Sequence, residues 1–271
     1  MKTWLVVSFL FVSVSSFGQD MKAIGHELAK SFNDIDTLNI VSRGLHPEID
    51  FHDSVTSANE EFALKLKQYT SKVPQTLAYS FPELSQTEVK IVTSPDGKLR
   101  IYSWDDMNEG SMRFFINVFQ YKGDKVHSQL SDTGNIDGEI INTGVYYSNI
   151  FQLNFGSRTV YIAQWHGNGS SIDYSAGIQL FEVSDSILND KVKMIKTKSG
   201  FSSGLHFEYD LTKVPENIGT LVRCEDNGKT IKIPVVNAAE AVTGKWITYK
   251  FDGQYYVPVF EKKKSKGKGE K

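Results

Sequence analysis

The sequence predicts a mainly β protein, and three observations lead to this fold class. From residue 77 onward, apolar and polar residues alternate along short segments, the period of a strand with one buried face. Turn residues separate these segments at intervals of about 8–12 residues, the spacing of β-sandwiches, barrels and propellers. The segments follow one another through short turns, which favours antiparallel pairing because parallel strands need long crossovers. We expect an antiparallel, propeller-like meander of about a dozen strands, with a β-sandwich as the alternative.

The first predicted hairpin has the clearest turn. Residues 89–93 and 99–104 alternate, and Ser94-Pro95-Asp96-Gly97 connects them. Proline presets φ for the second turn position, and glycine accepts the positive φ needed later. Further strands are expected at residues 114–121, from Val126 onward, and at 146–155, 159–165, 178–183, 192–195, 221–225, 230–235, 246–251 and 255–259. In this scheme 178–183 and 192–195 flank a loop around Asn189-Asp190.

Two short helices are expected before the strands. Residues 21–32 repeat apolar side chains every four positions, with Asp20 as a candidate N-cap, and residues 57–69 repeat them at i, i+4 and i+7. Leu45-His46-Pro47-Glu48 interrupts the helices, because a residue before proline avoids the α region. The predicted organisation is a signal peptide at 1–18, a helical segment at 19–75 packed on the main domain, an all-β domain at 76–260, and a disordered basic tail at 261–271.

The first nineteen residues predict export. Lys2 precedes an apolar run, and small residues at Ser16 and Gly18 fit the −3 and −1 positions of a cleavage site before Gln19. The run has at most fifteen residues, whereas a membrane-spanning helix needs about 20. We therefore expect a periplasmic or extracellular protein with no transmembrane segment in the mature chain.

Charge divides the chain into an acidic body and a basic end. Residues 19–260 hold 23 basic and 30 acidic side chains, a net charge of −7. This balance argues against nucleic acid, which requires a basic surface. Residues 261–271 hold six lysines and two glutamates and no apolar residue, so a solvated tail is expected. Contact with an anionic lipid or a cell-surface polymer is the alternative for this tail.

The turn at residues 94–98 resembles turns of known protein families, and the chain as a whole resembles a broader group of proteins. The turn Ser94-Pro95-Asp96-Gly97-Lys98, followed by an alternating strand, resembles the blade turns of TolB-like and peptidase-type propellers, over residues 94–104 only. The same turn approaches the aspartate box of sialidase-type propellers, but Gly97 stands where that motif has a spacer. The chain as a whole resembles exported Gram-negative proteins of unknown function. None of these resemblances implies an activity.

The first candidate site follows the second strand of the hairpin. Trp104, Asp105 and Asp106 precede a loop that contains Glu109, so two carboxylates could share acid–base work. The spacing does not match a calcium loop. The alternative is an acidic strand end in which Asp105 caps backbone amides.

The second candidate site is Trp165-His166-Gly167-Asn168-Gly169-Ser170-Ser171, read as a loop after a strand. An aromatic side chain beside small polar residues suits sugar recognition, and His166 could act as a base. The alternative is a flexible connection. Trp104, Asp105, Asp106, Trp165 and His166 are the predicted ligand-binding residues.

Other reactive residues do not form a recognisable site. His46 and His52 lie near acidic residues but lack zinc-binding spacing, and no phosphate loop or nucleophile elbow is present. We therefore expect no metal and no cofactor. The lone cysteine, Cys224, cannot form an intramolecular disulfide and is expected to be a small buried hydrophobe rather than a nucleophile.

These observations favour a binding or envelope-interaction protein over an enzyme. The expected partner is a cell-envelope polymer, such as a glycan, or an envelope protein bound at a sheet edge. The alternative is a secreted hydrolase that uses the loop carboxylates Asp105, Asp106 or Glu109. An exposed Trp104 or Trp165 would favour a glycan-binding role.

Overall fold

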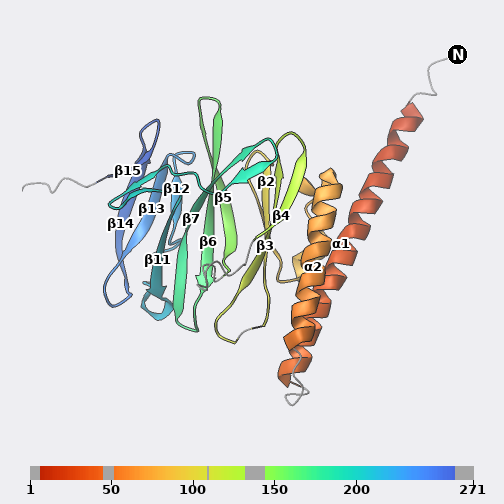
Figure 1. The fold of residues 1–271 in the computed structure, drawn as a ribbon, viewed down its shortest axis with the longest axis horizontal. Coiled ribbons are helices and arrows are strands. Elements are labelled where there is room, and N and C mark those ends of the chain that lie inside the picture. Colours follow the sequence, from red (N-terminus) through yellow and green to blue (C-terminus); the bar gives the residue numbers. More distant parts are fainter. Residues whose placement is uncertain (1–6, 45–51, 109, 132–143, 260–271) are drawn as a thin grey trace, which may run out of the picture.

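The computed structural model describes residues 7–44, 52–108, 110–131 and 144–259. The described chain is mainly β, as predicted, and consists of three sheets and two long helices stacked in layers (Figure 1). Helices α1 and α2 cover one face of the first sheet. The second sheet lies between the first and the third, and the third sheet forms the end of the stack opposite to the helices (Figure 1).

The helices and the first sheet come from the N-terminal half of the chain. The sheet has the order β1-β2-β3-β4, an antiparallel meander in which each strand pairs with the next. The bounds of these elements are α1 Val7–Gly44, α2 His52–Lys72, the 3₁₀ helices η1 Pro74–Leu77 and η2 Pro82–Gln86, β1 Lys90–Thr93, β2 Leu99–Asp105, β3 Phe115–Lys122 and β4 Val126–Leu130.

The second sheet has the order β11-β7-β6-β5, with the short strand β8 paired to β7. All its pairs are antiparallel. Its elements are β5 Tyr146–Phe155, β6 Arg158–Asn168, β7 Asp173–Ser184, β8 Ile187–Asn189 and β11 Gly204–Asp210, which leads into the 3₁₀ helix η3 Leu211–Lys213.

The third sheet has the order β10-β9-β15-β14-β13-β12. It is antiparallel except where β15 pairs with β9 in parallel. Its elements are β9 Ile195–Thr197, β10 Gly200–Ser202, β12 Arg223–Glu225, β13 Thr230–Val236, β14 Val242–Phe251 and β15 Tyr256–Val259. The three sheets do not close into a barrel, and a propeller-like arrangement stays a prediction.

Three apolar clusters hold the layers together. One lies between the helices and the first sheet, a second between the first and second sheets, and the third between the second and third sheets. Strand β2 shows the effect of a position inside the stack. Its residues Tyr102 and Trp104 belong to the cluster under the helices, while Leu99 and Ile101 belong to the cluster on the other side. Successive side chains of β2 therefore enter two different apolar clusters, and neither face of the strand is exposed to solvent.

The first hairpin forms as predicted. The Gly97 amide donates to the Ser94 carbonyl at 2.9 Å, and Gly97 has a φ of 69°. Asp96 accepts hydrogen bonds from the Ser94 hydroxyl and the Lys98 amide. β1 and β2 pair antiparallel on either side of this turn.

The predicted helices exist but are longer than expected. α1 has 38 residues, so Asp20 lies within the helix and is not its N-cap. The N-terminal part of α1 extends beyond α2 (Figure 1). α2 has 21 residues and begins before the predicted Ser57. α1 ends at Gly44, directly before the predicted break, whose residues lie outside the described part of the chain, as does the basic tail. Among the described residues, neither helix contains a stretch long and apolar enough to cross a bilayer.

The predicted pairing of 178–183 with 192–195 is wrong. β7 instead turns at Asp185, which has a φ of 46°, and pairs with β8. Ile195 begins β9 in the third sheet. The chain thus crosses between sheets where the sequence suggested a simple hairpin. The strand β11 was not predicted, because it pairs with β7 across a long sequence separation that local patterns do not report.

Candidate ligand-binding cleft

Trp104 is buried under the helices. Its side chain is 0% exposed and packs edge-on against Phe62 of α2, with ring centroids 4.9 Å apart. Its indole Nε1 donates to Oδ1 of Asn59 at 3.0 Å. Trp104 is therefore not the exposed ligand platform that was predicted, because α2 covers the face of β2 from which this side chain projects.

The carboxylates of Asp105 and Asp106 accept hydrogen bonds from nearby backbone amides. Asp105 accepts from the Met107 amide at 3.0 Å and pairs with Arg113 at 2.9 Å. Asp106 accepts from the Asn108 amide at 3.1 Å. This is the capping role that the sequence offered as the alternative. Glu109 lies outside the described residues.

Trp165 and His166 lie within strand β6 and not in the predicted loop. β6 continues to Asn168, where the Arg113 amide donates to the Asn168 carbonyl at 3.1 Å. This bridge brings the segment after Asp105 and the end of β6 side by side. The two predicted regions, about sixty residues apart in sequence, therefore meet at one end of the stack.

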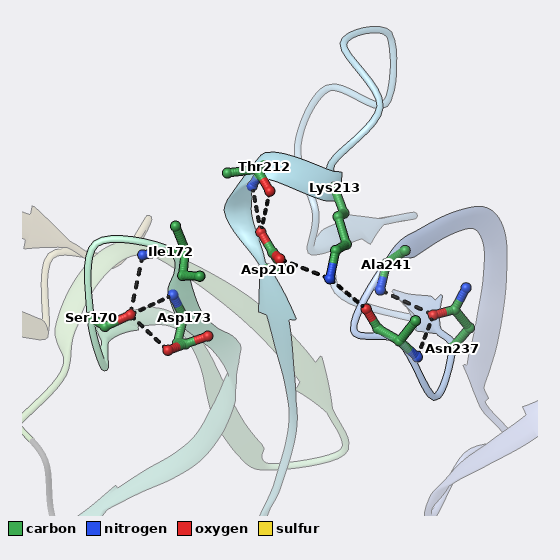
Figure 2. Close-up of polar contacts among 9 residues, drawn as sticks. Ser170, Ile172, Asp173, Asp210, Thr212, Lys213, Asn237 and Ala241 are labelled. Atoms are coloured by element: carbon green, nitrogen blue, oxygen red, sulfur yellow. Dashed lines mark hydrogen bonds and ion pairs between the residues drawn. The ribbon is translucent and has the colours of Figure 1, made fainter.

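The remaining polar loop closes on itself. The Ser170 hydroxyl donates to Asp173 Oδ2 at 2.7 Å and accepts from the amides of Ile172 and Asp173 (Figure 2). Nearby, Lys213 joins Asp210 to the Ala239 carbonyl, which links the end of β11 to the β13–β14 loop (Figure 2). The Lys213 contacts link the ends of the second and third sheets, whereas the Ser170 hydrogen bonds stabilise the loop between β6 and β7, so Ser170 has a structural role.

His166 projects from the side of β6 opposite to Trp165. It stacks on Tyr146 with centroids 5.2 Å apart, and its Nε2 lies 3.0 Å from the Ser148 hydroxyl. Burial, together with the nearby Lys90 ammonium, lowers the pKa of His166. The imidazole is therefore neutral at pH 7 and rests in an aromatic and polar enclosure.

Trp165 lies in a row of residues that crosses the second sheet. Tyr147 of β5, Trp165 of β6, Gly177 of β7 and His206 of β11 are consecutive cross-strand partners. A Cβ on Gly177 would lie 2.7 Å from Cζ2 of Trp165. The absent side chain of Gly177 lets the indole lie over β7, where His206 stacks with it at a centroid distance of 6.5 Å and an angle of 28°. The row forms a flat aromatic platform.

This platform faces a cleft of about 820 Å³ between the first and second sheets. Trp165 is half-buried and His206 is exposed, while Phe119, Tyr147 and Phe181 are buried beneath them. The volume lies within the range of about 300–1,000 Å³ that is usual for small-molecule sites. The cleft is lined by Asn117, Phe119, Gln129, Leu130, Ser131, Val145, Tyr147, Trp165, Ser175, Gln179, Phe181, Asp190, His206 and Glu208.

The cleft combines apolar rings with polar groups that have spare hydrogen-bonding capacity. Within the described residues, no hydrogen bond or ion pair engages the side chains of Ser175, Asp190 or Glu208. Asn117, in contrast, is fixed by Ser103 and by the Val145 carbonyl. The described lining contains two carboxylates, Asp190 and Glu208, and no lysine or arginine.

A second, smaller cavity of about 360 Å³ contains Asp105. Arg113, Lys90 and Tyr146 also line it, and the Lys90 ammonium lies 4.9 Å from the centroid of the Tyr146 ring. This cavity is separate from the platform, so Asp105 and Trp165 do not share a pocket.

Sequence reasoning found Trp165 but not the residues that complete its platform. Gly177, His206 and Glu208 lie on β7 and β11, and only the sheet pairing brings them to Trp165. The one available signal was Gly177 within an alternating strand, since such a glycine often marks a close approach.

The described residues provide little support for a metal site or a cysteine nucleophile. Among the described residues, no group of three or more His, Cys, Asp and Glu side chains is arranged to hold a metal ion. Burial raises the pKa of the Cys224 thiol to about 12, so this thiol stays protonated at neutral pH. Cys224 therefore behaves as a packing residue and not as an activated nucleophile.

No family model, curated protein or solved structure matches this chain.

Proposed function

We propose that this chain is an exported binding protein that holds a glycan segment in the cleft between its first two sheets. The observation that carries the proposal is the platform of Trp165 and His206 laid over Gly177. Sugar rings present apolar C–H faces that pack on aromatic surfaces, and their hydroxyl groups need hydrogen-bond partners. The cleft offers both kinds of surface within one volume.

The polar lining supports a neutral or amino-bearing sugar over an acidic one. Asp190 and Glu208 are exposed acceptors, and no lysine or arginine lies in the described lining. A uronate or sialate carboxyl would be repelled by these side chains, because like charges at short distance disfavour binding. Hydroxyl and amino groups, in contrast, donate to carboxylates.

The alternative of a hydrolase that uses Asp105 and Asp106 has less support. Asp105 is paired with Arg113 and lies outside the platform cleft, and both carboxylates accept backbone hydrogen bonds. Binding without bond cleavage needs only the platform and the polar lining. We therefore favour recognition over hydrolysis.

Export is the second part of the proposal, and the leader at residues 1–18 supports it. Removal of the leader would leave Gln19 as the first residue of α1. The test is intact mass and N-terminal sequencing of the secreted fraction. A product that begins at Gln19 supports export, whereas a cytoplasmic chain that retains Met1 contradicts it.

Glycan binding is tested by titrating the purified chain with neutral, amino-bearing and acidic oligosaccharides in a calorimeter or on an array. We expect binding of neutral or amino-bearing chains and a loss of at least about tenfold in affinity for Trp165→Ala, because stacking on an aromatic platform supplies much of such binding.

Leu64→Ala is a matched control, because Leu64 is 62% exposed on α2, in the outermost layer away from the cleft. Unchanged affinity in Trp165→Ala, or binding confined to acidic oligosaccharides, would contradict the proposal.

A further inference from the structure

The outer face of the third sheet is basic, and it is exposed chiefly along β9, β10 and the ends of β14 and β15. Cross-strand pairing identifies its side chains, because their neighbours along each strand, such as Ile231, Tyr249 and Tyr256, belong to the core. We define the outer face as Lys196, Phe201, Arg223, Glu225, Thr230, Lys232, Pro234, Trp246, Thr248, Lys250, Val257 and Val259, of which Thr230 and Pro234 are buried. Four of these residues are cationic and one is acidic.

One row on this face combines charge with apolar side chains. Lys250 of β14 pairs with Val257 of β15, the parallel contact of β15 with β9 brings Lys196 alongside, and Lys196 pairs with Phe201 of β10. Both lysines are exposed, and Phe201 is 48% exposed. Within the described residues, no ion pair engages Lys196 or Lys250. The row thus presents two ammonium groups that lack a salt-bridge partner in the described part of the chain, beside an exposed ring. The pKa of Asp252, in the turn between β14 and β15, is lowered mainly by backbone hydrogen bonds and, to a smaller extent, by the nearby Lys196 ammonium.

A second group on the same face holds its cations in place. The Arg223 guanidinium lies 4.1 Å from the centroid of the Trp246 ring and donates to the Ile218 carbonyl at 2.7 Å. Lys232 pairs with Glu225 at 2.8 Å. The only acidic side chain of the outer face is therefore already neutralised.

The basic character of this face contrasts with the rest of the molecule. The body has a net charge of −7, yet the outer face is positive. The chain continues from β15, within this same sheet, into residues 261–271, which add six lysines and two glutamates. Among the described residues, the outer face therefore carries an excess of positive charge, to which an anionic partner would be attracted.

We propose that this outer face docks onto an anionic lipid surface. A planar partner can contact Lys196, Lys250, Phe201 and Val259 together, since all four side chains are exposed on one face of the sheet. Each lysine near such a surface contributes favourably through the negative surface potential. Phe201 and Val259, exposed beside the lysines, are positioned to enter the headgroup region.

The test measures co-sedimentation of the purified full chain with vesicles of phosphatidylcholine alone or mixed with phosphatidylglycerol. We expect binding to the mixed vesicles only, lost at high salt because screening weakens exposed charges. The double variant Lys196→Glu/Lys250→Glu should reduce the partition coefficient by at least about tenfold. Both side chains are exposed, and an unchanged unfolding midpoint verifies the fold.

A matched control makes the same charge change on the opposite end of the stack. Lys22→Glu/Lys67→Glu alters exposed positions of α1 and α2 and should leave vesicle binding within about twofold of the parent. An equal loss in both double variants would show that net charge alone matters and would overturn the proposal.

Two further outcomes also overturn it. A chain that ends at Phe260 tests the basic tail separately. If this truncation abolishes binding and the face variant has no effect, the outer face is not the docking surface. If the chain binds polygalacturonate but not the anionic vesicles, the partner is an acidic polymer and not a lipid surface.

Discussion

Two tryptophans at the ends of neighbouring layers have opposite surroundings. Trp104 lies near the end of β2, fully buried beneath α2, and its indole nitrogen donates to Asn59. Trp165 lies near the end of β6, half-buried in a cleft, with His206 as a stacking neighbour. Both are followed by short polar segments in the sequence. The difference arises from what covers each sheet face, and the helices that bury Trp104 come from a distant part of the chain.

We therefore expect Trp104 to contribute mainly to stability and, under the proposed function, Trp165 to contact the ligand. The region under the helices is densely packed by aromatic side chains, including Phe32 and Phe62 at a centroid distance of 5.5 Å. The cleft side leaves polar groups available. Substitutions in the two regions should therefore differ in which property they change.

The largest expected effect is loss of stability in Trp104→Ala. Removing a fully buried indole should lower the free energy of unfolding by about 3–5 kcal/mol. Trp165→Ala should cost about 1 kcal/mol, because its side chain is already partly exposed. Urea unfolding followed by circular dichroism measures both. If Trp104→Ala does not fold, Trp104→Phe provides a milder version, and equal losses at positions 104 and 165 would remove the distinction.

Gly177→Ala should disturb the cleft region through a steric clash. The added Cβ would lie 2.2 Å from the Leu205 carbonyl oxygen and 2.7 Å from the Trp165 ring. We expect a loss of about 1–3 kcal/mol in unfolding free energy together with weakened glycan binding. Gly110→Ala is the matched control, because nothing lies within 4 Å of its Cβ position. A Gly177→Ala protein as stable as this control would refute the close approach.

Asn59→Ala should destabilise the helix-covered region. Its amide donates to the Asp106 carbonyl at 2.7 Å and accepts from the Trp104 indole at 3.0 Å. Loss of both contacts leaves buried polar groups unpaired and should cost about 1–3 kcal/mol, measured by thermal or urea unfolding. Glycan affinity should stay unchanged, and a fall in affinity at equal stability would show that the two regions are coupled.

The smallest expected effect is a pH dependence from His166. The pKa of His166 is lowered in the folded state by burial and by Lys90, so the unfolded state binds more protons at mildly acidic pH. Its contribution to stability is present above the unfolded pKa of about 6.5 and is lost as the pH falls through the folded pKa. Unfolding free energies measured from neutral to acidic pH should decline less steeply in His166→Gln. The same slope in both proteins would contradict this role.

The sequence predicted features that depend on neighbouring residues, but it did not predict which distant elements pack against a given side chain. The turn at Ser94–Gly97 and the bounds of β5 depend on neighbouring residues, and both match the structure. The burial of Trp104 depends on α2, about 45 residues earlier, and the platform of Trp165 depends on β11, about 40 residues later. No pattern within either segment reports such a neighbour.

The same reason explains the error at Trp165–Asn168. Glycines and polar residues there suggested a loop, yet pairing with β5 and β7 extends β6 to Asn168. Tertiary pairing outweighed local propensity, as often happens in strands. Gly167, predicted to lie in a loop, instead lies inside β6, where an added Cβ would lie 2.7 Å from the Ser175 hydroxyl oxygen.

The place of β15 has a consequence for how the protein is made. This last strand lies inside the third sheet, between β14 and β9, and its Tyr256 hydroxyl donates to the Gly228 carbonyl. β9 and β10 therefore have no partner linking them to the rest of their sheet until residues 256–259 have been synthesised. The third sheet can therefore be completed only after β15 has been synthesised, and a stop before Tyr256 would leave the sheet in two pieces.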